Sequence, residues 1–187
     1  MNKSYYFPIV YRFSFSIALM ISSIFICYGQ SKEAKIKDIR SLFQKINSDN
    51  TLKVIKLENE DIPGPALDNG QSLTAFYKGN TIYKIQAWVG LSYAIREYEF
   101  YLKDSQVFFV YEKESDFPSN EAKATLDHSK TVVAFEARYY LDKDKIIDVK
   151  SKGKKRFEGT SVMSAKDLLT IANDYLAIIK SRLKIKK

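Results

Sequence analysis

Six strand-like segments follow one another between Leu73 and Lys150, and most of them are joined by only two or three residues. The segments span 73–77, 81–89, 92–102, 106–114, 131–141 and 145–150, and they are rich in the β-branched and aromatic residues typical of strands. Connections this short make neighbouring strands antiparallel, because a parallel crossover needs about a dozen residues or more. Only the polar loop 115–130 is longer. The sequence therefore predicts an antiparallel β-meander of about six strands.

Three of the predicted hairpins repeat one pattern of side chains. Each has an aromatic pair, then a short polar turn, then a branched aliphatic residue. The aromatic pairs are Phe76-Tyr77, Phe100-Tyr101 and Tyr139-Tyr140. Successive hairpins of one kind would produce this repeat, and it favours the meander topology.

Helical patterns flank the strands on both sides. Apolar residues recur at helical spacing from Ile36 to Ile46, and again from Leu168 to Leu183 after a capping-type start at Ser164. A further short strand is predicted over 51–57. One face of the sheet has to be covered, and the two helices are the elements available to cover it. The predicted fold class is thus α+β, an antiparallel meander with the N- and C-terminal helices packed on one face.

The first 29 residues read as an export signal. A segment carrying Lys3 and Arg12 precedes 15 mostly apolar residues, Phe13 to Cys27, and small residues then favour cleavage after Gly29. The rival interpretation is a lipid-modified Cys27, although Phe25-Ile26 is a poor match to the small residue expected before such a cysteine. We therefore predict a signal peptide over 1–29 and a single α+β domain over 30–187, in the periplasm or secreted. No later apolar run is long enough to span a membrane.

Several segments resemble a group of uncharacterised small secreted or envelope proteins of bacteria. In this group, a helix precedes repeated hairpins of the type EYYF-turn-LIFVF. The similar segments are IRSLFQKIN (39–47), QSLTAFYKGNTIYKI (71–85), REYEFYLKDSQVFFVYEKE (96–114) and EARYYLDKDKIIDV (136–149). The resemblance implies an α+β fold and a location outside the cytoplasm. Its motifs are hairpin motifs, so it assigns no functional residue.

Glutamates on neighbouring strands are the candidates for catalysis. If the strands pair in simple register, an acidic stripe would form, with Arg96 and Arg138 in a complementary spot; its members would be Glu97, Glu99, Glu112, Glu114 and Glu136. Two of Glu97, Glu99, Glu112 and Glu136 could serve a carboxylate-dependent hydrolase. The alternative is an exposed sheet face with cross-strand charge pairs. The aromatic residues leave a similar choice between core packing and an open platform on the sheet. Because no catalytic motif accompanies the glutamates, a non-catalytic protein is the favoured interpretation.

The basic surplus of the chain lies at its C-terminal end. Residues 150–187 carry 11 basic and 3 acidic side chains, a net charge of +8, and residues 30–149 carry 17 basic and 19 acidic ones, a net charge of −2. Lys152, Lys154, Lys155 and Arg156 are predicted to form an exposed polar loop that contacts an anionic surface. The expected partner is an unknown protein or an anionic component of the cell envelope.

Other chemistries find little support in the composition. The single Cys and the single His, His128, exclude a disulfide within the chain and most Cys- or His-based metal sites. We therefore expect no metal and no cofactor. Nucleic acid is not an expected partner, because the predicted sheet region is slightly acidic. The sequence thus favours a binding or interaction module, with the hydrolase as the alternative.

Overall fold

The computed structural model describes residues 32–120, 124–157 and 162–184. The chain divides into two units, 1–38 and 39–187. Residues 32–47 are helical, and residues 39–47 of this helix belong to the second unit. The predicted signal segment and its cleavage site lie outside the described residues.

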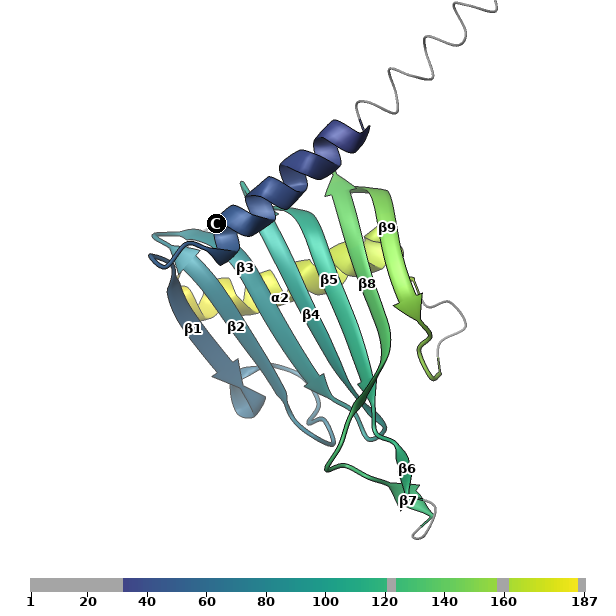
Figure 1. The fold of residues 1–187 in the computed structure, drawn as a ribbon. Coiled ribbons are helices and arrows are strands. Elements are labelled where there is room, and N and C mark those ends of the chain that lie inside the picture. The colour runs from purple at the N-terminus through teal and green to yellow at the C-terminus, as the bar shows by residue number, and fades with distance from the viewer. Residues whose placement is uncertain (1–31, 121–123, 158–161, 185–187) are drawn as a thin grey trace, which may run out of the picture. The chain divides into compact units, whose positions relative to one another are not determined.

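A seven-stranded antiparallel sheet forms the centre of the second unit (Figure 1). Its neighbours follow chain order except where a small β6–β7 hairpin is inserted. The strands are β1 Lys53–Glu58, β2 Gln71–Lys78, β3 Thr81–Gly90, β4 Ala94–Lys103, β5 Gln106–Asp116, β8 Val132–Asp142 and β9 Lys145–Gly153. The hairpin of β6 (Ser119–Asn120) and β7 (Thr125–Leu126) lies in the predicted long loop, and a 3₁₀ turn, η1, covers Asn59–Asp61. The predicted meander is confirmed.

The repeated sequence pattern corresponds to a repeated structural unit. The register shifts by one residue at Phe76/Tyr77, at Tyr101/Leu102 and at Tyr140/Leu141, which is beside the aromatic pair in each of the three hairpins. In the β4–β5 turn, Asp104 and Ser105 both have positive φ, as residues of a type I′ turn do. Each unit is therefore an aromatic pair, a β-bulge and a tight turn.

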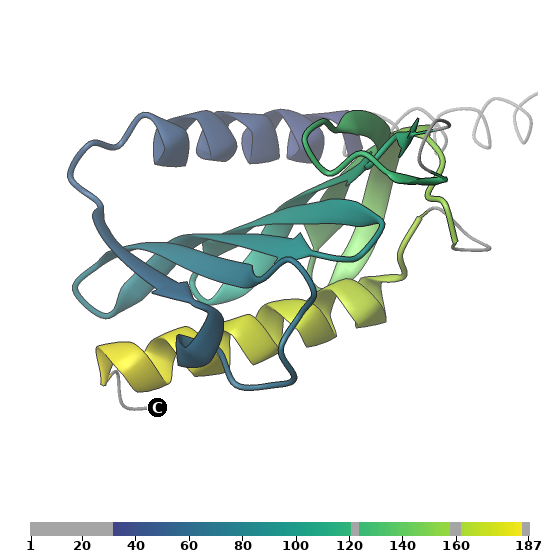
Figure 2. The ribbon, with the colours of Figure 1, turned by 90° about the horizontal axis from the view of Figure 1, so that it is seen from below.

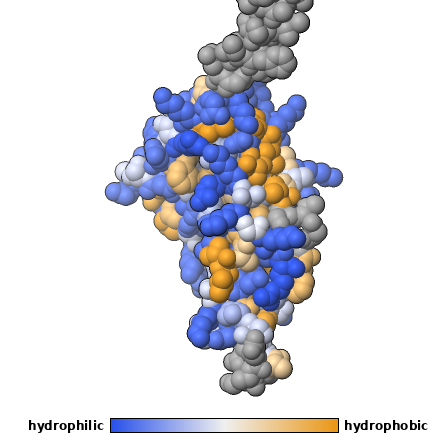
Figure 3. All heavy atoms as spheres, turned by 45° about the vertical axis from the view of Figure 1, so that its right-hand side comes forward, coloured by the Kyte–Doolittle hydropathy of each residue, from blue (hydrophilic) through white to orange (hydrophobic). Residues whose placement is uncertain are grey.

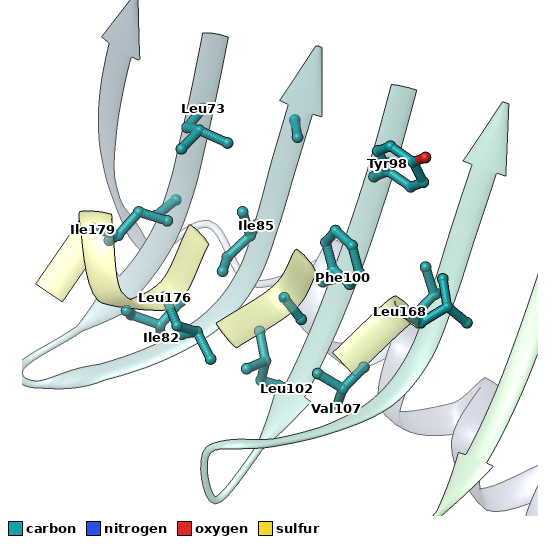
Figure 4. Close-up of a cluster of buried hydrophobic side chains, with 14 of the residues drawn as sticks. Leu73, Ile82, Ile85, Tyr98, Phe100, Leu102, Val107, Leu168, Leu176 and Ile179 are labelled. Atoms are coloured by element: carbon teal, nitrogen blue, oxygen red, sulfur yellow. The ribbon is translucent and has the colours of Figure 1, made fainter. Parts of the chain in front are cut away.

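The C-terminal helix α2, Ala165–Leu183, begins as predicted. The Ser164 hydroxyl accepts a hydrogen bond from the Asp167 N–H, and Lys184 closes the helix with φ of 55°. The buried side chains of α2 pack against the side chains that the strands direct toward it (Figure 4). This core includes Leu73, Ile85, Phe100, Leu102 and Val110 from the sheet and Leu168, Ala172, Leu176 and Ile179 from the helix.

The two helices do not share a face of the sheet, so that part of the prediction is wrong. Phe100 packs against Tyr175 of α2, with ring centroids 6.0 Å apart, and Tyr101 packs against Phe43 at 4.8 Å. Adjacent residues of a strand point to opposite faces. Residues 39–47 and α2 therefore lie on opposite sides of the sheet (Figure 2). We call these sides the α2 face and the Phe43 face.

Candidate functional site

The predicted acidic stripe does not form, because a bulge changes the register of β4 and β5. Next to the turn, Leu102 pairs with Val107, but Tyr101 pairs with Phe109, so Phe108 is an extra residue on β5. Beyond this bulge Glu97 lies opposite Lys113 and forms an ion pair with it. One extra residue reverses the faces of all later side chains relative to the partner strand.

The four predicted glutamates consequently lie on two faces. Glu112 pairs in register with the core residue Tyr98 and is fully buried on the α2 face. Glu97, Glu99 and Glu136 lie on the Phe43 face and are partly exposed. The sheet itself separates Glu112 from the other three, so the four carboxylates do not converge on one site.

Glu99 is the centre of a network on the Phe43 face. Its Oε1 accepts a hydrogen bond from Gln86 at 2.7 Å and lies 3.0 Å from the Lys84 ammonium, and its Oε2 lies 2.7 Å from the Tyr101 hydroxyl. Lys84 also donates to the side chain of Asn47 at 3.1 Å. Burial alone would raise the pKa of Glu99, but the hydrogen bonds from Tyr101, Gln86 and Lys84 together outweigh burial and lower it. The carboxylate is thus held in its charged form, which a general acid cannot use.

Glu136 has a different partner on the same face. The Tyr111 hydroxyl donates a short hydrogen bond to it, and the guanidinium of Arg138 lies 5.1 Å from the centre of the Tyr111 ring. Burial, followed by the hydrogen bond to Glu136, raises the pKa of Tyr111 to about 12. Tyr111 therefore stays protonated over the physiological range and anchors the carboxylate.

A buried ion pair lies on the α2 face. The Lys155 ammonium is 2.7 Å from Oε1 of Glu112, and the side chains are 1% and 0% exposed. The Tyr139 hydroxyl donates to Oε2 of the same carboxylate at 2.7 Å and accepts from the Met163 N–H at 3.1 Å. Lys155 and Met163, near the two ends of the segment that joins β9 to α2, are therefore held by one carboxylate and the tyrosine bonded to it.

Two further ion pairs extend this buried network along β5. Arg96 contacts the fully buried Glu114 at 2.6 Å, and Arg156 contacts Asp116 at 3.0 Å. Arg156 also donates to the carbonyl of Phe117 at 3.2 Å. Since Glu112, Glu114 and Asp116 alternate along one strand, they share a face and are matched by three cations. The arrangement is an anchor for the chain that crosses from β9 to α2.

The predicted basic loop is divided between a strand and this anchor. Lys152 belongs to the end of β9, and Lys152 and Lys154 are exposed. Lys155 is buried, however, and the side chain of Arg156 is only 29% exposed in its pair with Asp116. The prediction of one exposed site containing all four residues is therefore wrong for Lys155. A polar loop was expected because charged residues are rarely buried unless they are paired. The acidic partners of Lys155 and Arg156 lie about forty residues earlier in the chain, where no local pattern reveals them.

Glu114 and Arg96 were predicted to lie in the acidic stripe and in its complementary spot, but neither was a candidate catalytic or binding residue. Glu112 and Glu114 are two residues apart in a segment that is otherwise largely apolar. That spacing places both on one strand face, and a face with two carboxylates needs cations within reach. Arg96, directly opposite Glu114 on the neighbouring strand, is such a cation.

The remaining candidates do not join a site. The ring of His128 packs against Phe117 with centroids 4.4 Å apart. Among the described residues, no group of three or more His, Cys, Asp or Glu side chains is arranged to hold a metal ion. One hollow of about 550 Å³ is lined by loop residues from Asn59 to Gln71, and another of about 240 Å³ lies beside Lys84. None of the four glutamates lines either hollow.

No helix in the described part of the chain combines the length and the apolar character that a membrane span requires. In comparisons with known proteins, no family model, no curated protein and no solved structure matches the chain.

Proposed function

We propose that this protein is a non-catalytic, exported binding protein of the cell envelope, whose exposed cations contact a protein or an anionic polymer. The observation that carries this proposal is the distribution of ionic groups. The carboxylates on the central strands are engaged within the fold, while several lysines at the C-terminal end of β9 remain exposed.

The carboxylate geometry favours binding over hydrolysis. A hydrolase needs two carboxyl groups in one cleft, with environments that separate their pKa values. Glu112 is separated from Glu99 and Glu136 by the sheet, and its charge is matched by Lys155. Glu97 is matched by Lys113 on the neighbouring strand. Both ion pairs have a structural explanation: a buried carboxylate needs a counter-ion, and opposite charges on neighbouring strands stabilise a sheet.

The exposed cations favour an anionic partner. Lys150, Lys152 and Lys154 are exposed where β9 ends. Each cation near an anionic surface contributes about 1 kcal/mol of attraction. Lys155 is engaged in its buried pair and Arg156 in its pair with Asp116, so these three lysines are the unpaired, accessible part of the basic run among the described residues.

The location in this proposal rests on the N-terminal sequence and on the resemblance to secreted and envelope proteins of bacteria. Mass spectrometry of the protein isolated from its native host is expected to give a chain that begins at Gln30. An acylated Cys27 at the N-terminus would instead make the protein a lipoprotein.

The binding proposal is tested with dextran sulfate as a soluble polyanion and neutral dextran as its control. We expect the exported form, residues 30–187, to bind dextran sulfate and to release it as salt is raised, because the Debye length falls from about 30 Å at 0.01 M to about 8 Å at 0.15 M. The variant Lys152→Gln/Lys154→Gln should bind more weakly than the matched variant Lys53→Gln/Lys56→Gln on β1. Equal binding of both dextrans, or no binding of either, contradicts the proposal.

A further inference from the structure

Within the part of the chain that the structure describes, strand β9 forms one edge of the sheet. In this part of the chain β8 is the one strand that pairs with β9, and residues 150–153 are all exposed. Between Val149 and Gly153, no backbone hydrogen bond runs to a described residue outside β8. Figure 1 shows β9 at this edge, and Figure 3 turns that side of the molecule forward, where hydrophilic residues surround separate hydrophobic groups. An open edge presents N–H and C=O groups that can pair with another strand.

A row of alternating charges crosses the Phe43 face and ends at this edge. Glu97 lies opposite Lys113, Lys113 lies opposite Glu136, and Glu136 lies opposite Lys152. The signs along β4, β5, β8 and β9 are therefore negative, positive, negative and positive. Opposite charges directly across strands stabilise a sheet. The next position in this row, beyond β9, would favour an acidic side chain.

The neighbouring row of side chains on this face favours an acidic neighbour even more strongly. Arg138 of β8 lies opposite Lys150 of β9, so two cations are adjacent across the strands. Arg138 is positioned over the ring of Tyr111, 5.1 Å from its centre. Among the described residues, neither Lys150 nor Lys152 forms an ion pair. Like charges placed opposite each other destabilise a pair of strands, and an acidic neighbour on the outer side would relieve this repulsion.

We infer that an extended acidic segment of a partner protein adds to β9 as an eighth strand. Its backbone would pair with the open edge, and acidic side chains at alternate positions would lie beside Lys150 and Lys152, since residues two apart share a face. This inference rests on the proposed binding function and names its surface and partner. A second copy of this chain that paired through β9 with Lys150 opposite Lys152 would bring like charges together, whereas an acidic segment meets both lysines with opposite charge.

The inference is tested with a labelled peptide in which Glu alternates with Val or Thr. Two control peptides keep its composition: one has alternate backbone nitrogens methylated, so that it carries the charge without the edge hydrogen bonds, and the other has its glutamates in one block. We expect the alternating peptide to bind at least about tenfold more tightly than either control, as measured by fluorescence anisotropy. Hydrogen exchange should slow at the amides of residues 145–153 when this peptide is bound.

Charge reversal provides the matched variants. Lys150→Glu/Lys152→Glu should lose binding of the Glu peptide and gain binding of the same peptide with Lys in place of Glu, while Lys53→Glu/Lys56→Glu on β1 should behave as the wild type. Equal binding of the methylated peptide, or equal loss from both double variants, would overturn the edge inference. If dextran sulfate binds and the alternating peptide does not, the edge inference fails and the proposed function stands. If neither binds, both fail.

Discussion

The buried pair of Glu112 and Lys155 allows a quantitative prediction about stability. The side chains are 0% and 1% exposed, so replacing one partner leaves the other charge in the interior without its counter-ion. Such a loss typically costs about 3–5 kcal/mol. We therefore expect Lys155→Met to lower the free energy of unfolding by about 3–5 kcal/mol, whereas an exposed loop lysine would leave it nearly unchanged.

The double-mutant cycle isolates the interaction between the two side chains. Glu112→Gln keeps an acceptor for the Tyr139 hydroxyl but removes the carboxylate charge that faces the Lys155 ammonium. The double variant Glu112→Gln/Lys155→Met removes both charges of this pair. We expect it to be less destabilised than the sum of the two single variants by about 2 kcal/mol or more, because residues in direct contact deviate from additivity by up to about 3 kcal/mol.

Urea unfolding followed by circular dichroism and by the fluorescence of Trp88 measures these differences. The exposed pair Lys56–Glu58 on β1, whose side chains are 58% and 59% exposed, is the control. Variants of that pair should change the free energy of unfolding by less than about 1 kcal/mol. Additive effects of less than about 1 kcal/mol at Glu112 and Lys155 would refute the reasoning and show that the pair does not hold the segment between β9 and α2.

Two further predictions concern the end of β9 and the titration of Tyr111. Gly153→Ala should lower the melting temperature, because Gly153 has φ of 83° and a Cβ there would lie 1.9 Å from the carbonyl oxygen of Ala134; an unchanged thermal transition would contradict the strain. The pKa of Tyr111 is raised to about 12, so its stabilising contribution is complete below the ordinary value near 10 and is lost as pH rises from about 10 through about 12. Tyrosinate absorbance should show Tyr111 titrating at lower pH in Glu136→Gln, and identical titration curves for this variant and the wild type would remove Glu136 as a cause.

The strands and turns are determined by local sequence. β3 and β5 begin at the predicted residues Thr81 and Gln106, and α2 begins after the predicted cap at Ser164. These features depend on the preferences of adjacent residues for strand, turn or helix, and short connections leave only an antiparallel order. The α+β class and the meander could therefore be predicted from the sequence.

The sequence contains evidence that both faces of the sheet are covered, and the prediction of the helix positions did not use it. Val107, Phe108, Phe109 and Val110 form a continuous apolar run, and all four are buried. A strand with such a run is covered on both faces, whereas alternation indicates one covered face. The run therefore favours helices on opposite sides of the sheet, as observed for residues 39–47 and α2.

Only the tertiary structure decided which charges meet. Without the bulge at Phe108, the register beside the β4–β5 turn would place Glu97 opposite Glu112; with it, Glu97 meets Lys113 and Glu112 turns to the other face. Glu112 then requires a cation, and Lys155 supplies it from a segment that no local pattern connects to β5. A strand alternates with a period of two, so one extra residue reverses every later side chain, and the charges that meet depend on pairing between strands distant in the sequence.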